Sequence, residues 1–406
     1  MSLKSVERFF IKNKVNYLVI EKNDKVDLDK YDYLIKSPSI SLYDSIIIEC
    51  KKKKIKVISD LELFYLLYPN NYYVIVTGTN GKTSVINNLH NLLLFNNLEH
   101  YYIGNMGNPI FDVAGEVLYN KIILIECSSY MLETTNNFKP NIYTITNLST
   151  HHIEHHKSKR LYYRSKLMII KRMDKGILIN PSNNIYVNNI RNKKVYNVRF
   201  KSVLNDNHLI LDKYKFNLEN ISKFSKFDIT NLITSFIMFY YIYMEYKLNI
   251  DLYQTFEYLD KIKKYPFRFE KIVDNNDLVV INDSKSTNID SGIKALIEMN
   301  EKYSNFYLII GGKYLNQKFG KVKKYLNNVK CLYLYGENKN IIYNKLKSKV
   351  NIIMCNNLEE IIDDIFLYNN DKKIILFSPM STSFDQFKSF EQRGEYFNQL
   401  INKKIL

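Results

Sequence analysis

The segment best suited to chemistry is a short glycine loop, T-G-T-N-G-K-T-S at residues 77–84. It follows an apolar run and opens a segment with helical spacing, so a strand and a helix are predicted to flank it. Gly78 and Gly81 allow a tight turn whose backbone N–H groups can approach a phosphate. Lys82 would offer a positive charge to the β and γ phosphates, and Thr83 a hydroxyl to magnesium. A chance glycine turn is the alternative, and the flanking pattern favours a nucleotide-binding loop.

Acidic and histidine side chains follow two other apolar runs. Glu126 ends the run at residues 121–126, and a histidine-rich tract follows the run at residues 142–147. The tract contains His151, His152, His155 and His156. Pairs four positions apart could hold zinc if the tract were helical, whereas a loop after a strand end is the competing interpretation. For Glu126, an ordinary carboxylate at a strand end is the alternative to a magnesium ligand.

Elements that could position these residues recur along the chain. Short apolar runs alternate with helical spacing, which predicts an α/β fold with mostly parallel sheets whose strands are covered on both faces. The predicted strands are Tyr17–Glu21, Tyr72–Thr77, Lys121–Glu126, Ile142–Asn147, Leu278–Asp283, Phe306–Ile310, Leu332–Tyr335 and Ile374–Phe377. Predicted helices include Ser5–Lys14 and Ser84–Phe95. Turn-prone residues place domain boundaries near residues 69–72 and 265–266.

Length and composition restrict the class of protein. The 406 residues are too many for one compact core, so two or three domains are expected. Four separated cysteines without a C-x-x-C pair favour buried, reduced thiols over a disulfide framework or a zinc site. No apolar run reaches the ~18 residues of a membrane helix, and no signal peptide is recognised. A soluble, cytoplasmic protein without membrane insertion is therefore expected.

The net charge of +17 raises the hypothesis of nucleic-acid binding. The lysines, however, are scattered among asparagine, isoleucine and tyrosine, and the one strong run, Lys51–Lys54, is short. A solvated basic surface is therefore favoured over a nucleic-acid site. Such a surface would also suit an anionic substrate.

An ordered set of motifs resembles the Mur ligase family, and within it the members that add D-glutamate. Beside the phosphate loop, the matching segments are G-N-M-G-N-P at 104–109, E-C-S-S-Y-M-L-E at 126–133, N-L-S-T-H-H-I-E-H-H at 147–156, Y-Y-R-S-K at 162–166, P-F-R-F-E at 266–270, N-D-S-K-S-T-N at 282–288 and S-P-M-S-T-S-F-D-Q-F-K-S-F-E-Q-R-G at 378–394. The D-N-P-R motif of diaminopimelate-adding members is absent, and Asn80 stands where L-alanine-adding members usually have histidine.

The resemblance implies an ATP-dependent enzyme that joins D-glutamate to UDP-N-acetylmuramoyl-L-alanine in peptidoglycan precursor synthesis. ATP would phosphorylate the substrate carboxylate, and the D-glutamate amine would attack the acyl phosphate. The implied architecture is a shortened Rossmann-like domain at residues 1–69 for the UDP substrate, a P-loop ATPase-like domain at 70–265 and a Rossmann-like amino-acid-binding domain at 266–406. A monomer is expected. The alternatives are another amide ligase of the family, including folylpolyglutamate-type enzymes, and a non-catalytic binding protein derived from one.

Position within these motifs implies roles for individual residues. Those expected to bind ATP are Gly78, Thr79, Asn80, Gly81, Lys82, Thr83, Ser84, Arg268, Asn282 and Asp283. Those expected to contact substrate are Asn105, Lys285, Thr287, Ser383, Phe384 and Phe390. Lys82, Glu126, His152 and Lys166 are expected to be catalytic, the last three with Thr83 as magnesium ligands. Lys166 matches a lysine that the family carbamylates, for which a surface lysine is the alternative. Asp385, Gln386 and Arg393 have a structural interpretation instead.

Several positions depart from the family pattern. Lys313-Tyr314-Leu315 follow Gly311-Gly312, where a D-x-K segment is expected whose lysine holds the D-glutamate side chain. Lys313 or Lys318 is therefore expected to replace that cation, since a second buried carboxylate needs a partner. Asp228 replaces an asparagine expected to contact the nucleotide. In the histidine tract, His151 replaces aspartate and His155 replaces arginine.

The N-terminal segment is the least regular part of the resemblance. The family begins with a strand and a glycine loop for uridine diphosphate, whereas helix Ser5–Lys14 already matches the helix after that loop. The strand Tyr17–Glu21 would place Glu21 near the uracil, and Tyr33–Ile40 resembles an S-P-G-I turn with Ser39 for glycine. A late start-codon assignment and a shortened domain are the competing explanations. Without the loop, weakened uridine diphosphate binding is expected, partly offset by Lys4 and other basic side chains.

Overall fold

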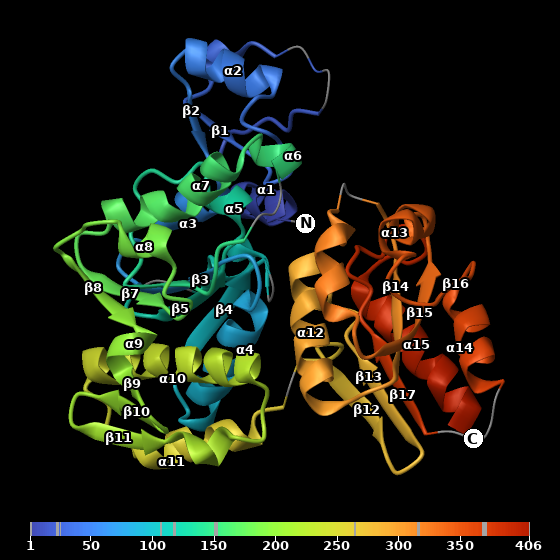
Figure 1. The fold of residues 1–406 in the computed structure, drawn as a ribbon. Coiled ribbons are helices and arrows are strands. Elements are labelled where there is room, and N and C mark those ends of the chain that lie inside the picture. The colour runs from blue at the N-terminus through green and yellow to red at the C-terminus, as the bar shows by residue number, and fades with distance from the viewer. Residues whose placement is uncertain are drawn as a thin grey trace. The chain divides into compact units, whose positions relative to one another are not determined.

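The computed structural model of the protein describes residues 2–21, 24, 26–105, 108–116, 119–149, 153–263, 265–314, 317–367 and 372–405 (Figure 1). The chain forms two compact units, Met1–Ile262 and Lys263–Leu406. Both are built on six-stranded, mainly parallel sheets with helices between the strands, which confirms the predicted α/β class. None of the described helices combines the length and the apolar character needed to span a lipid bilayer.

The main sheet of the first unit has the strand order β4-β5-β3-β6-β7-β8, with every neighbouring pair parallel. Its strands are β3 (Tyr72–Thr77), β4 (His100–Gly104), β5 (Ile122–Glu126), β6 (Ile142–Ile145), β7 (Gly176–Asn180) and β8 (Val195–Arg199). A small antiparallel sheet joins β9 (Leu204–Asn205), β10 (His208–Leu211) and β11 (Tyr214–Asn217). The central strand β3 is buried along its whole length, as its continuous apolar run predicts.

Helices cover both faces of this sheet. Those described in the first unit are α1 (Ser2–Lys12), α2 (Ser45–Lys52), α3 (Asp60–Leu67), α4 (Lys82–Phe95), α5 (Ser129–Leu132), α6 (Ile153–His156), α7 (Lys159–Arg172), α8 (Ile185–Asn188), α9 (Phe200–Val203), α10 (Lys226–Tyr246) and α11 (Leu252–Glu257), with short 3₁₀ turns η1 (Leu28–Lys30), η2 (Ile110–Val113), η3 (Leu218–Ile221) and η4 (Tyr258–Lys261). Val74 and Val76 share one core with α4 and α10. Tyr73 and Ile75, which point the opposite way, share the other core with α3 and α7.

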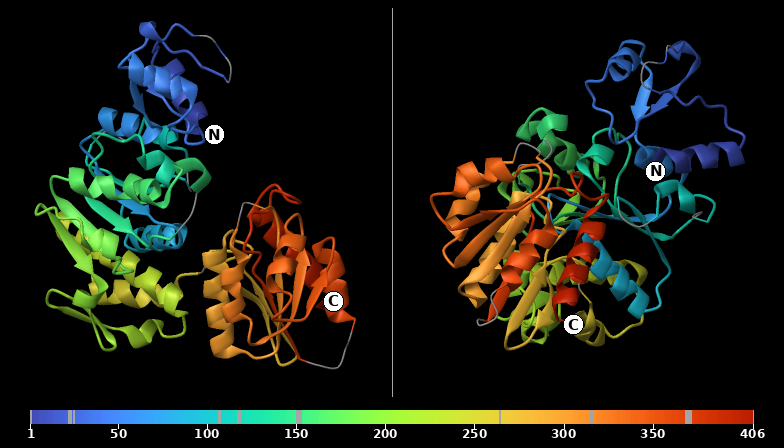
Figure 2. Two further views of the ribbon diagram at one scale, coloured as in Figure 1. Left: turned by 45° about the horizontal axis from the view of Figure 1, so that its top comes forward. Right: turned by 90° about the vertical axis from the view of Figure 1, so that its right-hand side faces the viewer.

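The first predicted domain lies at one end of this unit (Figure 2). Its sheet has two parallel strands, β1 (Tyr33–Ile35) and β2 (Lys56–Ile58). The predicted strand Tyr17–Glu21 is wrong, because these residues form no strand and Leu18 and Val19 are 49% and 54% exposed. An apolar run becomes a strand only where a neighbour pairs with its backbone. The predicted separation of this domain from the next at residue 69 stays a prediction.

The sheet of the second unit has the strand order β12-β13-β17-β14-β15-β16, in which only β12 and β13 pair antiparallel. Its strands are β12 (Glu270–Asp274), β13 (Leu278–Asn282), β14 (Phe306–Gly311), β15 (Val329–Tyr335), β16 (Ile352–Met354) and β17 (Lys373–Phe377). Its helices are α12 (Ile289–Lys302), η5 (Phe319–Tyr325), α13 (Lys339–Leu346), α14 (Leu358–Phe366) and α15 (Phe390–Ile405). One core contains α12, η5 and α13, and the other contains α14 and α15.

Candidate active site

The predicted phosphate loop connects β3 to α4, and glycine is required at both of its turns. Gly78 and Gly81 have φ angles of 140° and 87°, which side chains other than glycine rarely adopt. Space is limited as well. A Cβ on Gly78 would lie 2.0 Å from Thr146 Oγ1, and one on Gly81 would lie 3.0 Å from Asn231 Oδ1. The glycines thus let the loop pack directly against neighbouring segments of the same unit.

Hydrogen bonds from the residues that follow β6 fix the backbone of the phosphate loop. Asn147 accepts a hydrogen bond from the Asn80 N–H at 3.0 Å and donates one from Nδ2 to the Asn80 carbonyl at 2.8 Å. Thr146 donates to the same carbonyl at 2.6 Å, and the Thr79 N–H donates to the Asn147 carbonyl at 3.0 Å. These hydrogen bonds within the protein restrict the loop conformation, which reduces the ordering entropy that a bound ligand would cost.

Lys82 opens α4 and lies over this loop. Its Nζ donates to the carbonyl oxygens of Gly78 at 3.2 Å and Thr79 at 3.1 Å. Thr83, the next residue, is only 4% exposed. A cation at the N-terminal end of a helix, above a ring of backbone groups, provides a site for an anion.

Lys166 lies directly behind the loop on α7, so the surface-lysine alternative is wrong. The residue is 1% exposed, and its Nζ donates to Thr77 Oγ1 at 2.9 Å. Its Nζ also lies 5.2 Å from the ring centre of Tyr162, whose hydroxyl oxygen is 3.0 Å from Thr79 Oγ1. Burial, reinforced by the nearby charge of Lys82, holds the pKa of the Lys166 amine well below its ordinary value. The direction of this shift favours the uncharged amine, which is the nucleophilic form.

Glu126 ends β5 beside β3, opposite Val76 in the parallel register. It is 1% exposed, and its Oε1 accepts a hydrogen bond from Asn105 Nδ2 at 3.1 Å. Its Oε2 is buried and finds no hydrogen-bond donor among the described residues. A buried carboxylate oxygen in this condition is costly unless a cation or another donor binds it.

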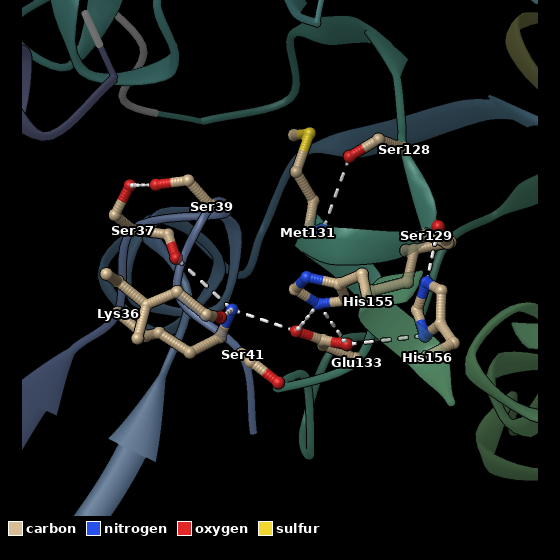
Figure 3. A network of polar contacts seen from close by, with 12 residues as sticks. Lys36, Ser37, Ser39, Ser41, Ser128, Ser129, Met131, Glu133, His155 and His156 are labelled. Atoms are coloured by element: carbon tan, nitrogen blue, oxygen red, sulfur yellow. Dashed lines mark hydrogen bonds and ion pairs between the residues drawn. The ribbon is translucent and has the colours of Figure 1, made fainter. Parts of the chain in front are cut away.

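The histidine tract is described in part. His151 and His152 lie outside the described residues, so the expected magnesium ligand His152 and the zinc pairs stay predictions. In α6, Nε2 of His155 lies 3.0 and 3.2 Å from the two carboxylate oxygens of Glu133 (Figure 3). His156 Nε2 lies 2.9 Å from Ser129 Oγ. Burial lowers the pKa of His156 to about 4, so this imidazole is neutral at pH 7.

In the second unit, Asn282 and Asp283 stand at the end of β13, as predicted. The Asn282 side chain donates to Gly394 O at 2.9 Å and to Asn398 Oδ1 at 2.7 Å, so it ties α15 to the sheet. Its predicted nucleotide contact stays a prediction. Asp283 accepts from Ser378 Oγ at 2.8 Å and from the Phe269 N–H at 3.1 Å. Burial nevertheless raises the pKa of Asp283 to about 7.

Two of the predicted substrate residues meet directly in this unit. Nζ of Lys285 lies 3.6 Å from the ring centre of Phe390, a close cation–π contact. Ser383 is 2% exposed, whereas Phe384 is 64% exposed. The N–H of Thr287 donates to the Lys285 carbonyl at 2.8 Å, which turns this loop back on itself.

Arg393 connects the two loops that carry these residues. It is fully buried and donates to Ser284 Oγ at 3.1 Å, Ser284 O at 2.7 Å and Ser381 O at 3.0 Å. These contacts support the structural interpretation of Arg393. Gln386 likewise donates to Asn356 O at 2.8 Å, and Asp385 accepts from the Glu337 N–H at 3.2 Å.

The two candidate replacement lysines have different surroundings. The N–H of Lys313 donates to Thr382 O at 2.9 Å in an isolated antiparallel bridge, which places Lys313 alongside the residue before Ser383. No partner for its ammonium group is found among the described residues. Lys318 precedes η5, and no hydrogen bond from Lys318 to Thr382 or Ser383 is found among the described residues. The altered Asp228 lies in the first turn of α10, where its carboxylate accepts from Ser225 Oγ at 2.9 Å.

Four supporting residues were not assigned a role from the sequence: Thr146, Asn147, Tyr162 and Asn231. Each contacts the phosphate loop from a segment distant in the chain. Asn147 and Tyr162 belong to recognised motifs, so their motif membership was the available signal. Thr146 carries no comparable local signal, because a single polar residue near a strand end is common.

Sequence comparison relates the chain to known proteins. Residues 76–239 match the family described as Mur ligase middle domain. A UDP-N-acetylmuramoylalanine--D-glutamate ligase of Prochlorococcus marinus (strain MIT 9312) is 31% identical over 399 residues, which cover 93% of this chain and 83% of the relative. The ligase of the same name from Francisella philomiragia is 28% identical over 400 residues, which cover 97% of this chain and 92% of the relative.

Solved structures show the same fold at lower sequence identity. MurF ligase from Thermotoga maritima in complex with ADP superposes with a TM-score of 0.62 at 12% identity, covering 94% of this chain and all of that one. Escherichia coli FolC in complex with DHPP and ADP gives a TM-score of 0.61 at 11% identity, covering 85% of this chain and 92% of that one. At such identities the likeness establishes the fold alone.

Proposed function

Because the chain belongs to the Mur ligase family, we propose that it joins D-glutamate to UDP-N-acetylmuramoyl-L-alanine, converting ATP to ADP and phosphate. Both relatives described above are named for that reaction and are matched over most of their length. One observation carries the proposal: the buried Lys166 amine and the Glu126 carboxylate lie beside the phosphate loop at the ends of β3 and β5. Such a cluster suits phosphoryl transfer, which is catalysed chiefly by positioning and charge stabilisation.

The proposed reaction has two steps. A carboxylate oxygen of the nucleotide-sugar substrate attacks the γ phosphorus, the bond to the β–γ bridging oxygen breaks, and ADP leaves. The D-glutamate amine then attacks the acyl carbon, and phosphate departs from the tetrahedral intermediate as the amine loses its proton. Lys82 offsets the negative charge on the transferred phosphoryl group, because its ammonium already lies over the loop.

The residues present fit a magnesium ion. Glu126 Oε2 is a buried oxygen in need of a positive partner, and Thr83, in the first turn of α4, offers a hydroxyl. When bound, magnesium would neutralise phosphate charge and align the reacting oxygens. The resemblance adds His152 and a carbamylated Lys166 to this ligand set.

Carbamylation of Lys166 is chemically suited to its environment. A neutral amine attacks carbon dioxide, forms a carbon–nitrogen bond and releases one proton. Burial and the Lys82 charge lower the pKa of the Lys166 amine and so favour its neutral, reactive form. The carbamate would convert the neutral amine to an anion, which Lys82 and magnesium can balance.

The remaining domains are proposed to bind the other substrates. We assign residues 1–69 to the UDP substrate, 70–265 to ATP and 266–406 to D-glutamate. Lys285, Phe390, Ser383 and Thr287 are proposed to position the amino acid, with Arg268 and Asp283 directed to the nucleotide. The reaction is proposed to take place in the cytoplasm.

Phosphate release in the presence of ATP and UDP-N-acetylmuramoyl-L-alanine tests the function when a panel of amino acids is supplied one at a time. We expect release with D-glutamate and a product heavier by one glutamyl residue. Turnover with another amino acid or with a folate substrate would indicate a different ligase of the family. ATP binding without turnover under any combination would indicate a non-catalytic protein.

A further inference from the structure

A buried ion pair in the first unit has no role in the chemistry described above. Lys36 Nζ lies 2.8 Å from Glu133 Oε1, and the two side chains are 1% and 4% exposed. Lys36 also donates to the carbonyl oxygens of Ser37 at 3.2 Å and Ile40 at 2.8 Å. The ammonium group therefore uses its three protons inside the protein, and it closes the turn at residues 37–40 around itself (Figure 3).

Glu133 extends this contact to α6. Its two oxygens lie 3.0 and 3.2 Å from His155 Nε2, and Oε2 lies 3.6 Å from His156 Nδ1. His156 in turn reaches Ser129 Oγ at 2.9 Å. The ring of Tyr130 stacks on His156 with centroids 5.5 Å apart and meets His155 edge-on at 4.3 Å. One carboxylate thus joins the turn after β1 to α5 and α6.

The same contacts continue to the phosphate loop. The ring of His156 packs against Tyr162 with centroids 5.4 Å apart. The Tyr162 hydroxyl oxygen lies 3.0 Å from Thr79 Oγ1, and Lys166 Nζ lies 5.2 Å from the Tyr162 ring. An unbroken series of contacts therefore runs from Lys36 to the residues proposed to hold ATP and magnesium.

Two other roles for this cluster are less consistent with its charges. Ligand atoms of Glu133, His155 and His156 lie within 4.8 Å of one another, a spacing that could hold a metal ion. The Lys36 ammonium already balances Glu133, so a divalent cation would add uncompensated positive charge in a buried place. A purely stabilising role is also a weak explanation for the Lys36–Glu133 pair, because apolar residues can often replace a buried ion pair without loss of stability.

We propose that Lys36 is a positioning residue. It holds the turn at residues 37–40, in the proposed UDP-substrate domain, in a fixed position relative to the phosphate loop. This inference rests on the proposed function, which requires the substrate carboxylate to meet the γ phosphate at about 3–3.5 Å. A directional ion pair fixes the turn at one place, whereas an apolar contact would let it slide. The turn at residues 37–40 lies in the proposed UDP-substrate domain, and Thr79 lies in the proposed ATP domain.

The test compares Lys36→Met, the double variant Lys36→Met/Glu133→Gln and a control, Lys30→Met. Lys30 pairs with Asp27 at 3.4 Å in the same domain, but both side chains are mostly exposed. Steady-state kinetics give KM and kcat, calorimetry gives Kd for the UDP substrate and for ATP, and thermal unfolding gives Tm. Calorimetry keeps the readout independent of turnover.

We expect Lys36→Met to raise Kd and KM for the UDP substrate about tenfold and to lower kcat about tenfold, with Kd for ATP within about twofold. The double variant should recover Tm, because no buried charge is left unpaired, but not KM or kcat. Lys30→Met should match the wild type. If the wild type binds the UDP substrate but does not ligate it, the proposed function is refuted. The comparison of Kd values between wild type and variants would still test the role of Lys36.

Three outcomes would overturn the inference. Recovery of substrate affinity together with Tm in the double variant would reduce the pair to a stabilising role. Equal behaviour of Lys36→Met and Lys30→Met would show that the pair positions nothing. Stoichiometric zinc binding by the wild type that the double variant loses would make the cluster a metal site.

Discussion

Lys166 donates a hydrogen bond from Nζ to Oγ1 of Thr77 at 2.9 Å, at the point where β3 enters the phosphate loop. The same threonine hydroxyl donates to the Cys127 carbonyl at 2.8 Å, one residue beyond Glu126. Thr77 therefore links the amine of Lys166 to the ends of both β3 and β5. This relationship puts a lysine with a strongly lowered pKa next to the site of phosphoryl transfer.

Replacing Lys166 with alanine should abolish ligation, because an oxygen ligand for magnesium is lost with the proposed carbamate. Short carboxylic acids such as acetate should restore part of the activity, since a small acid can fill the vacated space and supply an oxygen. Activity would be followed as phosphate release at increasing acetate concentrations. Full activity of the unrescued variant would remove Lys166 from the site.

Substitution of Lys82 by alanine should lower kcat by about a thousandfold or more, because transition-state charge on the phosphoryl group loses its cation. The fold should persist, since the Lys82 side chain is only partly buried and its hydrogen bonds to the Gly78 and Thr79 carbonyls stay within the loop. Circular dichroism and Tm would be compared with those of Lys171→Ala, an exposed lysine on α7. A correctly folded Lys82→Ala enzyme with near-normal turnover would contradict the assignment.

The buried His156 should make stability depend on pH. Its pKa is lowered to about 4 by burial and by the charges of His155, Lys166 and Lys36, with Glu133 acting in the opposite direction. In the unfolded chain a histidine pKa is about 6.5, so the unfolded state binds more protons between these values. Stability should therefore fall as pH falls from about 6.5 toward 4.

Chemical denaturation of the wild type and His156→Gln at pH 7 and pH 4.5 measures this effect. Between pH 7 and pH 4.5, the free energy of unfolding should fall by about 2 kcal/mol more in the wild type than in the variant. Glutamine retains a polar group for Ser129 but cannot take up a proton. An equal fall in the free energy of unfolding of both proteins would show that His156 is not responsible for the loss of stability in acid.

Recognition of the D-glutamate side chain should depend on Lys313. Its backbone bonds to Thr382, next to Ser383, whereas Lys318 lies before η5 without such a bond. Lys313→Met should raise KM for D-glutamate about tenfold or more, because a charged hydrogen bond to the carboxylate is lost. Lys318→Met is the matched comparison and should have a smaller effect. If neither variant raises KM, another group holds the second carboxylate.

Much of the fold could be predicted where local signals are strong. The run Tyr72–Thr77 forms β3 with the predicted bounds, since a continuous apolar segment suits a central strand. The strands β1 and β2, with three residues each, carry too little pattern to be recognised. Tyr17–Glu21 has the pattern but no pairing strand, so composition alone misled the prediction.

For the candidate site, the sequence by itself determined the chemical groups and the local backbone elements that carry them. Glycines at Gly78 and Gly81, a following lysine and a helix define a phosphate loop, because these constraints act within a few residues. Only the tertiary structure decided that Lys36 meets Glu133 and that Lys166 meets Thr77. Such pairs depend on how distant segments pack, and the resulting desolvation and neighbouring charges determine which groups are charged.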